Sequence, residues 1–187
     1  MVGVLLLGLL AIIGVTILRM HQLIFVHLFV GLALIGPVAL KMASTGYRFV
    51  RYYTHDRSYV AVGPPVPLLR LIAPVVVLST VAVLISGVIL LFLGPTDRGQ
   101  MLLIHKVAFF VWGGFIVLHV LGHLRGLRGY LVASRRTRTA VVGPDPGSGG
   151  RVAAIGGALL GGVVLALLLL PQYAAWTAAT AFLHHHH

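Results

Sequence analysis

Four ionisable side chains interrupt a long apolar stretch at residues 102–124, LLIHKVAFFVWGGFIVLHVLGHL: His105, Lys106, His119 and His123. About 20 apolar residues cross the ~30 Å hydrocarbon core of a bilayer. Because ionisable groups inside a membrane span are costly, they are candidates for a functional site. His105 and His119 are fourteen residues apart, which on a helix is a rise of about 21 Å and a return to within roughly 40° of the same face. The spacing therefore places one imidazole near each end of the span.

Two imidazoles on one helix face suit two stacked haem groups, because neutral imidazole is a common axial ligand of haem iron. Gly113 and Gly114 lie between them and leave room for a flat macrocycle. Two other interpretations stay open. The histidines could form hydrogen bonds that hold neighbouring helices together, or His119 and His123, one turn apart, could be two ligands of a transition-metal site.

The composition indicates a membrane protein. Of the 187 residues, 59% are hydrophobic and 9% are charged, against about 25% charged in a soluble domain. The absence of cysteine excludes disulfides, thiolate ligands, iron–sulfur clusters and c-type haem attachment. Glutamate is also absent, which argues against a cation transporter with intramembrane carboxylates. The net charge of +11 does not indicate nucleic-acid binding, because the basic residues cluster in loops beside apolar spans.

The hydropathy pattern predicts an all-α integral membrane bundle with five transmembrane helices, four of which form a haem-binding core. The predicted spans are residues 2–18, 23–43, 68–93, 102–124 and 152–170, within one membrane domain of residues 1–183; residues 184–187 have the character of an expression tag. Within this plan we expect Pro37 to kink the second span, residues 124–151 to form a loop, and Gly157 and Gly161 to allow close helix packing. Tyr173 and Trp176 are expected at the membrane interface.

Arginine asymmetry between loops predicts the orientation. The loops after the second and fourth spans contain most of the arginines, so we expect them on the cytoplasmic side of a bacterial cytoplasmic membrane. The N-terminus is then cytoplasmic, whereas Asp97 and the C-terminus are outside.

This orientation predicts a pair of haem ligands. The second and fourth spans run in the same direction, and His27 and His105 lie at similar distances from their outer ends. We therefore expect these two imidazoles to bind one haem iron from opposite sides, with Gly31 giving space beside His27. Arg98 and Lys106 are close enough to that level to neutralise haem propionates.

The inner level lacks such a pair. The position on the second span that matches His119 in depth is Lys41, followed by Met42. A lysine is cationic and a poor ligand, whereas a methionine thioether is an axial ligand in some cytochromes. His21 and His55 are predicted to be loop residues.

The segments HLFVGLALIGPVALKMASTGYRFVRYY and LLIHKVAFFVWGGFIVLHVLGHL resemble bacterial membrane b-type cytochromes, the cytochrome b and b561-like group, and most closely short five-span actinobacterial-type members. The resemblance covers roughly residues 19–125. It implies non-covalent haem b bound by histidines of different helices, and electron transfer between quinone or quinol and a partner redox protein. The second span departs from a two-haem arrangement because it supplies one histidine instead of two, so one haem is expected and a second is possible.

Two other classes use the same residues. A transition-metal or cation transporter would bind metal through His27, His105 and His119 without haem. A non-catalytic membrane anchor would hold haem, or nothing, beside a redox partner subunit. We expect no catalytic side chain in any of the three.

Overall fold

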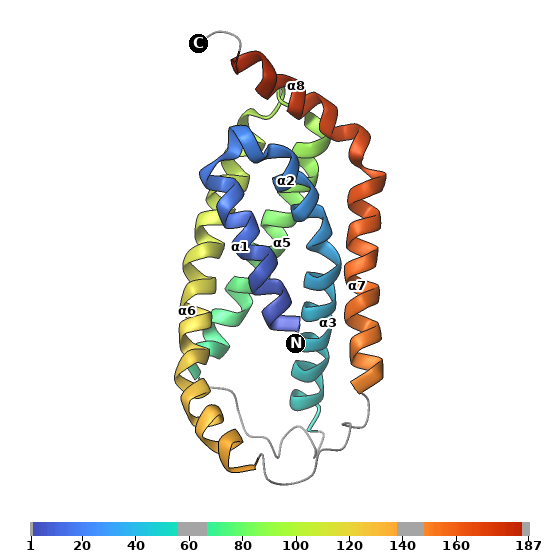
Figure 1. Cartoon of the computed structure of the whole chain (residues 1–187). Helices are drawn as coiled ribbons and strands as arrows, with labels where there is room; N and C mark the ends of the chain where they lie inside the picture. The colour runs from blue at the N-terminus through green and yellow to red at the C-terminus, as the bar shows by residue number, and fades with distance from the viewer. Residues whose placement is uncertain (1, 56–66, 138–147, 185–187) are drawn as a thin grey trace.

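The computed structural model describes residues 2–55, 67–137 and 148–184, and every element in them is helical. The elements are α1 (Val2–Leu18), α2 (Met20–Ala33), α3 (Ile35–Tyr53), α5 (Pro67–Leu93), α6 (Gly99–Thr137), α7 (Ser148–Leu168), the 3₁₀ turn η1 (Leu170–Gln172) and α8 (Tyr173–His184). They form an elongated bundle in which α8 crosses one end (Figure 1).

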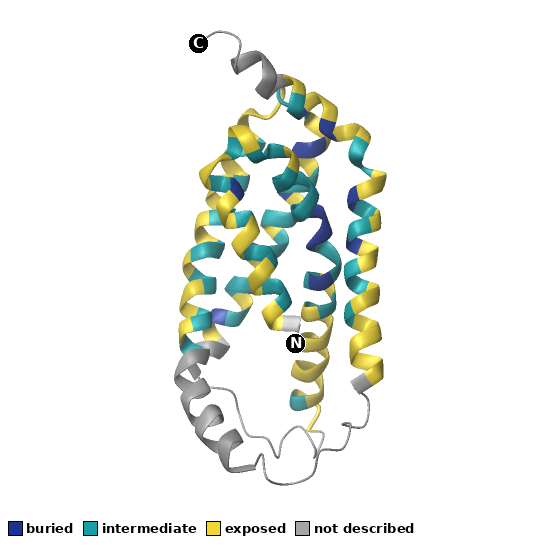
Figure 2. Ribbon diagram, in the orientation of Figure 1, coloured by how far each residue is buried: buried dark blue, intermediate teal, exposed yellow. Residues whose placement is uncertain are grey.

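The predicted all-helical membrane architecture is confirmed, but the described helices include four that are long and apolar enough to cross a bilayer, not five. These segments are Met20–Tyr53, Leu71–Leu93, Gly99–Gly122 and Gly149–Leu168. The helix α1 has 17 residues, or about 26 Å of rise, and is shorter than the other four. Large apolar side chains cover the outside of the bundle, for example Leu71 (75% exposed) and Phe110 (73% exposed). Exposed residues line the outer faces of the long helices (Figure 2), as contact with lipid requires.

Two helices extend beyond their predicted ends. The second span is divided at Leu34, between α2 and α3, where Pro37 lacks the N–H that would bond to the Ala33 carbonyl, but Leu34 keeps helical dihedral angles (φ −65°, ψ −25°). The kink in this span lies at Leu23 (φ −116°, ψ 19°), not at the predicted Pro37. The chain then remains helical to Tyr53 instead of ending near residue 43. Similarly, α6 continues to Thr137 and α7 starts at Ser148, so the loop predicted at residues 124–151 is largely helix; its middle part, residues 138–147, lies outside the described residues. The leucines, alanine and arginines of residues 124–137 favour a helix, which hydropathy alone does not reveal.

The close crossing between α7 and the second span uses different small residues from those predicted. A Cβ atom added at Gly36 would overlap the Ala158 carbonyl, and one added at Gly162 would overlap the Ala33 carbonyl. Gly157 and Gly161 have no such neighbour within 4 Å. The packing motif is therefore Ala158 and Gly162, one position along from the predicted pair. It lets the backbone of α7 contact the backbone of the second span directly, with no side chain between them.

The helix α8 closes one end of the bundle. Tyr173 and Trp176 are buried, with 2% and 9% exposure. The Tyr173 hydroxyl donates to the Ala166 carbonyl (3.0 Å), and the Trp176 indole N–H donates to the Leu91 carbonyl (3.4 Å). These two side chains pack into the hydrophobic core with Leu32, Leu90 and Leu91, so they do not face outward from the bundle; their place at the depth of a membrane interface stays a prediction.

The bundle has two groups of helices that meet mainly at this end. The helices α5 and α6 form one hairpin, and α1, α2, α3 and α7 form the other group. We call the end with α8 and the turns α1–α2 and α5–α6 the capped end, and the opposite end, where α3 finishes and α5 starts, the distal end (Figure 1). The core that joins the two groups lies at the capped end.

A candidate cofactor site with two facing histidines

A large cavity lies between the two helix groups. Its volume is about 2510 Å³, whereas a typical small-molecule site has about 300–1,000 Å³. Residues of α1, α2, α3, α5 and α6 line it, most of them apolar, and His27, His105 and His119 are among them. The cavity therefore combines an apolar environment, room for more than one large ligand, and metal-ligating side chains from two separate walls.

His27 enters this cavity from α2 and is held by α1. Its Nδ1 atom lies 2.8 Å from the Thr16 hydroxyl oxygen. The Thr16 hydroxyl donates its single proton to the Ile13 carbonyl of its own helix (2.6 Å), so it can only accept from the ring. This arrangement favours the tautomer with the proton on Nδ1, in which Nε2 retains the lone pair that a metal ion needs.

His105 enters from α6 and is held by α5. Its Nδ1 atom lies 2.9 Å from the Ser86 hydroxyl oxygen, and Ser86 donates to the Ala82 carbonyl (2.6 Å) and, over a longer distance, to the Val83 carbonyl (3.1 Å). The ring also has a hydrogen bond to the Val83 backbone, so α5 offers it two acceptors, and both favour a ring that keeps a proton on the nitrogen facing α5. Gly87, next to Ser86, makes room for this ring: a Cβ atom there would lie 3.3 Å from His105 Cε1.

The two imidazoles share a level in the bundle. Both α2 and α6 start at the capped end (Figure 1). His27 lies four residues beyond the kink at Leu23, near the start of α2, and His105 follows Gly99 by six, or about 6 Å and 9 Å of helix. The two rings are near enough for an electrostatic interaction between them.

Polar side chains that can bind an anion border the cavity near this level. Arg98, Lys106 and His21 line it, and none of the three is buried within the protein. The structure thus brings the predicted propionate partners Arg98 and Lys106 to the same cavity as the two histidines, together with His21. A guanidinium or ammonium group in this position can form charge-assisted hydrogen bonds to a carboxylate.

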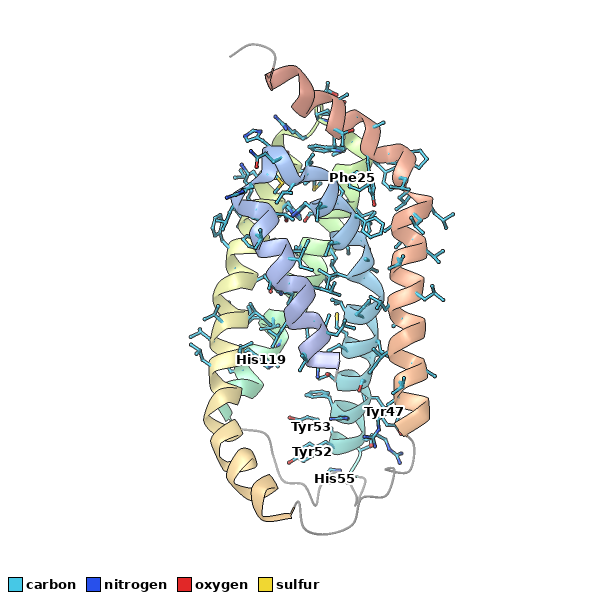
Figure 3. All side chains as sticks on the ribbon, viewed as in Figure 1. Phe25, Tyr47, Tyr52, Tyr53, His55 and His119 are labelled. Carbon is cyan, nitrogen blue, oxygen red and sulfur yellow. The ribbon has the colours of Figure 1, made fainter. Side chains whose placement is uncertain are left out.

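His119 lies at a different level. It lines the cavity, its Nδ1 atom is shielded from solvent, and it lies toward the distal end, above Tyr53 and Tyr52 of α3 (Figure 3). Lys41 and Met42 also line this part of the cavity. No set of three His, Cys, Asp or Glu side chains gathers into a metal site within the described residues. The side chain of His123 lies outside the described residues.

The glycines divide differently from the prediction. Gly31 lines the cavity, with nothing within 4 Å of its added Cβ position. Gly113 and Gly114 have similarly open surroundings but do not belong to the cavity lining. The glycine that touches a candidate ligand is Gly87.

Sequence reasoning missed Thr16, Ser86 and Gly87. Thr16 is the only polar side chain of residues 2–18, and Ser86–Gly87 interrupts an apolar run of α5. A lone hydroxyl in an apolar span indicates a hydrogen bond to a neighbouring helix, but the sequence does not reveal which imidazole ring it contacts. Comparison of the chain with protein-family models, curated proteins and solved structures gives no match.

Proposed function

We propose that this membrane protein binds haem b between His27 and His105 and transfers electrons in the membrane. The observation that carries the proposal is the pair of imidazoles on opposite walls of one apolar cavity, each with Nδ1 held by a hydroxyl and Nε2 left for a metal. Two protein ligands suffice for a six-coordinate haem iron, whereas a bare metal ion needs three or four.

The residues of the cavity have separable roles in this proposal. His27 and His105 are the axial ligands. Arg98 and Lys106, which both line the cavity, bind the propionates. The apolar wall excludes water and so favours the less charged state of the bound group. Haem, when bound, supplies an iron that accepts and releases one electron at a time.

The size of the cavity and the position of His119 support a second haem at the distal level. His119, with Met42 on the facing helix, is the candidate pair for a second haem. Quinone or quinol and a partner redox protein are the proposed electron donor and acceptor. They follow from the resemblance to b-type cytochromes and not from a contact in the structure.

The proposal is tested by a pyridine haemochrome assay on protein purified from haem-sufficient cells, with metal analysis on the same sample. We expect haem b close to one per chain or above, and sharp α and β bands on reduction. Colourless protein that carries stoichiometric zinc or copper would overturn the haem proposal and favour a metal transporter.

We also propose that the distal end is cytoplasmic, because Arg48 and Arg51 lie at the end of α3 whereas Asp97 lies in the turn at the capped end, and arginine is enriched on the cytoplasmic side. Single cysteines introduced at Arg51, Arg136 and Asp97 into this cysteine-free chain can be labelled with an impermeant thiol reagent in intact cells. We expect labelling at position 97 only. Labelling at 51 and 136 but not at 97 reverses the orientation.

A further inference from the structure

We infer that Thr16 and Ser86 are positioning residues that set the tautomer and orientation of the two haem-binding imidazoles. The inference rests on the proposed function for its haem-dependent part. Its hydrogen-bond part concerns the polypeptide alone and can be measured without haem.

The burial and the hydrogen bonds of the Thr16 and Ser86 hydroxyls leave each of them able to accept a bond from a histidine ring. Thr16 is 1% exposed and Ser86 is 3% exposed, so water does not compete for them. Each donates to a carbonyl of its own helix at 2.6 Å, which leaves oxygen lone pairs for the neighbouring helix. In both cases the group that meets those lone pairs is the Nδ1 atom of a cavity-lining histidine.

The arrangement occurs once in each helix group. The hydroxyl of α1 holds the ring of α2, and the hydroxyl of α5 holds the ring of α6. Each ligand is therefore fixed from within its own group, independently of whatever fills the cavity between the groups. The short helix α1, whose main packing partners among the described helices are α2 and α3, gains a function from this contact.

Ser79 is a buried hydroxyl of α5 that bonds to its own helix and not to a histidine. It lies on the same helix as Ser86, is 7% exposed, and donates to the Val75 carbonyl at 2.6 Å. Its burial and its bond to the helix thus match those of Ser86, but both of its hydrogen bonds go to carbonyls of α5, those of Val75 and Val76. Ser79→Ala is therefore the matched control for Ser86→Ala.

A neutral hydroxyl acceptor has a definite effect on a metal-binding imidazole. Donation from Nδ1–H increases the electron density at Nε2, and an outer partner of this kind typically changes metal affinity about 10–100-fold when lost. Loss of the acceptor makes Nε2 a weaker donor, which stabilises ferric iron less than ferrous iron. The reduction potential should therefore rise in both variants.

The experiment compares Thr16→Val, Ser86→Ala and Ser79→Ala with the unchanged chain, and includes Thr16→Ser, which keeps the hydroxyl. The readouts are haem affinity, reduction potential, and ¹⁵N NMR of the imidazoles in haem-free protein. We expect the first two variants to bind haem roughly 10–100-fold more weakly, with raised potentials. In Thr16→Val the His27 ring should show a mixture of tautomers instead of Nδ1–H alone. In Ser86→Ala the change at His105 should be smaller, because the Val83 backbone remains as a second acceptor. Ser79→Ala and Thr16→Ser should resemble the unchanged chain.

The two proposals fail differently. If Thr16→Val and Ser86→Ala match Ser79→Ala in affinity, potential and tautomer, the positioning roles are wrong while the haem site stands. If the unchanged chain binds no haem, the proposed function fails, and the NMR of the haem-free protein still decides whether the hydroxyls set the tautomers.

If Thr16→Val and Ser86→Ala do not fold, the same NMR spectra lose the chemical-shift dispersion of a folded protein. In that case Thr16→Ser decides: it must keep both the fold and the Nδ1–H tautomer of His27, and a mixed tautomer in this variant contradicts the inference.

Discussion

The capped and distal levels of the cavity contain the same kinds of side chain but differ in how those side chains are held. At the capped level His27 and His105 come from opposite walls, and each bonds to a buried hydroxyl of its neighbouring helix. At the distal level His119 lines the cavity without a second histidine of the described residues predicted at its depth; Lys41 and Met42 of α3 line the same cavity. The hydrophobic core that joins the two helix groups also lies at the capped end, whereas the last turns of α3 are exposed.

The comparison shows that a histidine at the right depth is only part of a ligand site. A ring needs a partner on the facing wall and an acceptor that fixes its proton, and both must be built into a packed part of the bundle. The capped level meets these conditions for two rings. We therefore expect the tightly bound haem there, and any second haem at the distal level to bind more weakly.

The largest expected effect comes from removing the ligands themselves. His27→Ala or His105→Ala should each remove one axial bond from haem b that has no covalent attachment, because the chain has no cysteine. We expect the loss of affinity to exceed the roughly 10–100-fold cost of losing an outer partner, with any remaining haem five-coordinate. The measurement is haem per polypeptide together with reduced-minus-oxidised spectra.

The distal histidines provide the control for that prediction. His119→Ala should leave the capped-level spectrum and stoichiometry unchanged, with any loss confined to a second haem of lower occupancy. Adding His123→Ala should have no further effect. If His119→Ala removes all haem and His27→Ala keeps it, the proposed pairing is wrong and the distal level is the principal site.

A smaller effect should follow from crowding one ring without removing it. In Gly87→Ala the new Cβ would lie 3.3 Å from His105 Cε1 and 3.7 Å from Nδ1, so the ring must move by a few tenths of an ångström. We expect haem to be retained with affinity reduced about tenfold, or about 1.4 kcal/mol. Gly114→Ala is the control, because it meets nothing within 4 Å and lies outside the cavity lining. Equal behaviour of the two variants would show that Gly87 has no part in seating the ring.

Sequence periodicity and hydropathy were sufficient for the elements that depend on local properties. The apolar runs predicted a helical membrane protein. The predicted span 68–93 ends where α5 ends, at Leu93, before Gly94 with φ +73°, and the predicted span 152–170 ends within two residues of the end of α7 at Leu168. The depth argument also brought His27, His105, Arg98 and Lys106 into one cavity, although their roles toward haem stay a prediction.

The features that sequence missed depend on contacts between helices. Both Gly157 with Gly161 and Ala158 with Gly162 satisfy a small-residue pattern. The rotation of α7 about its own axis decides which pair packs against the second span, and the structure selects Ala158 and Gly162. Similarly, nothing local distinguishes Ser86 from Ser79, since both are buried and bonded to their own helix. Only the position of α6 assigns the imidazole to one of them. Trp176 and Tyr173 have an interfacial composition, but α8 turns them onto the bundle end.

The smallest expected effect tests the tight packing of the capped end. Burial raises the pKa of Tyr173, so the folded protein retains a proton that the unfolded chain releases near pH 10. The stability contributed by the protonated hydroxyl is therefore complete below about pH 10 and declines as the pH rises above it. Tyr173→Phe removes this pH-dependent loss of stability together with the hydrogen bond to the Ala166 carbonyl, at a cost of about 1 kcal/mol of stability at neutral pH.

Thermal unfolding in detergent at neutral and alkaline pH measures both effects, with Tyr52→Phe at the distal end as the control because that ring is only partly buried. We expect Tyr173→Phe to be less stable than the unchanged chain at neutral pH, and the difference to narrow above pH 10. An unchanged difference across that range, or an equal loss in Tyr52→Phe, would contradict the claim that the capped end is the more tightly packed of the two.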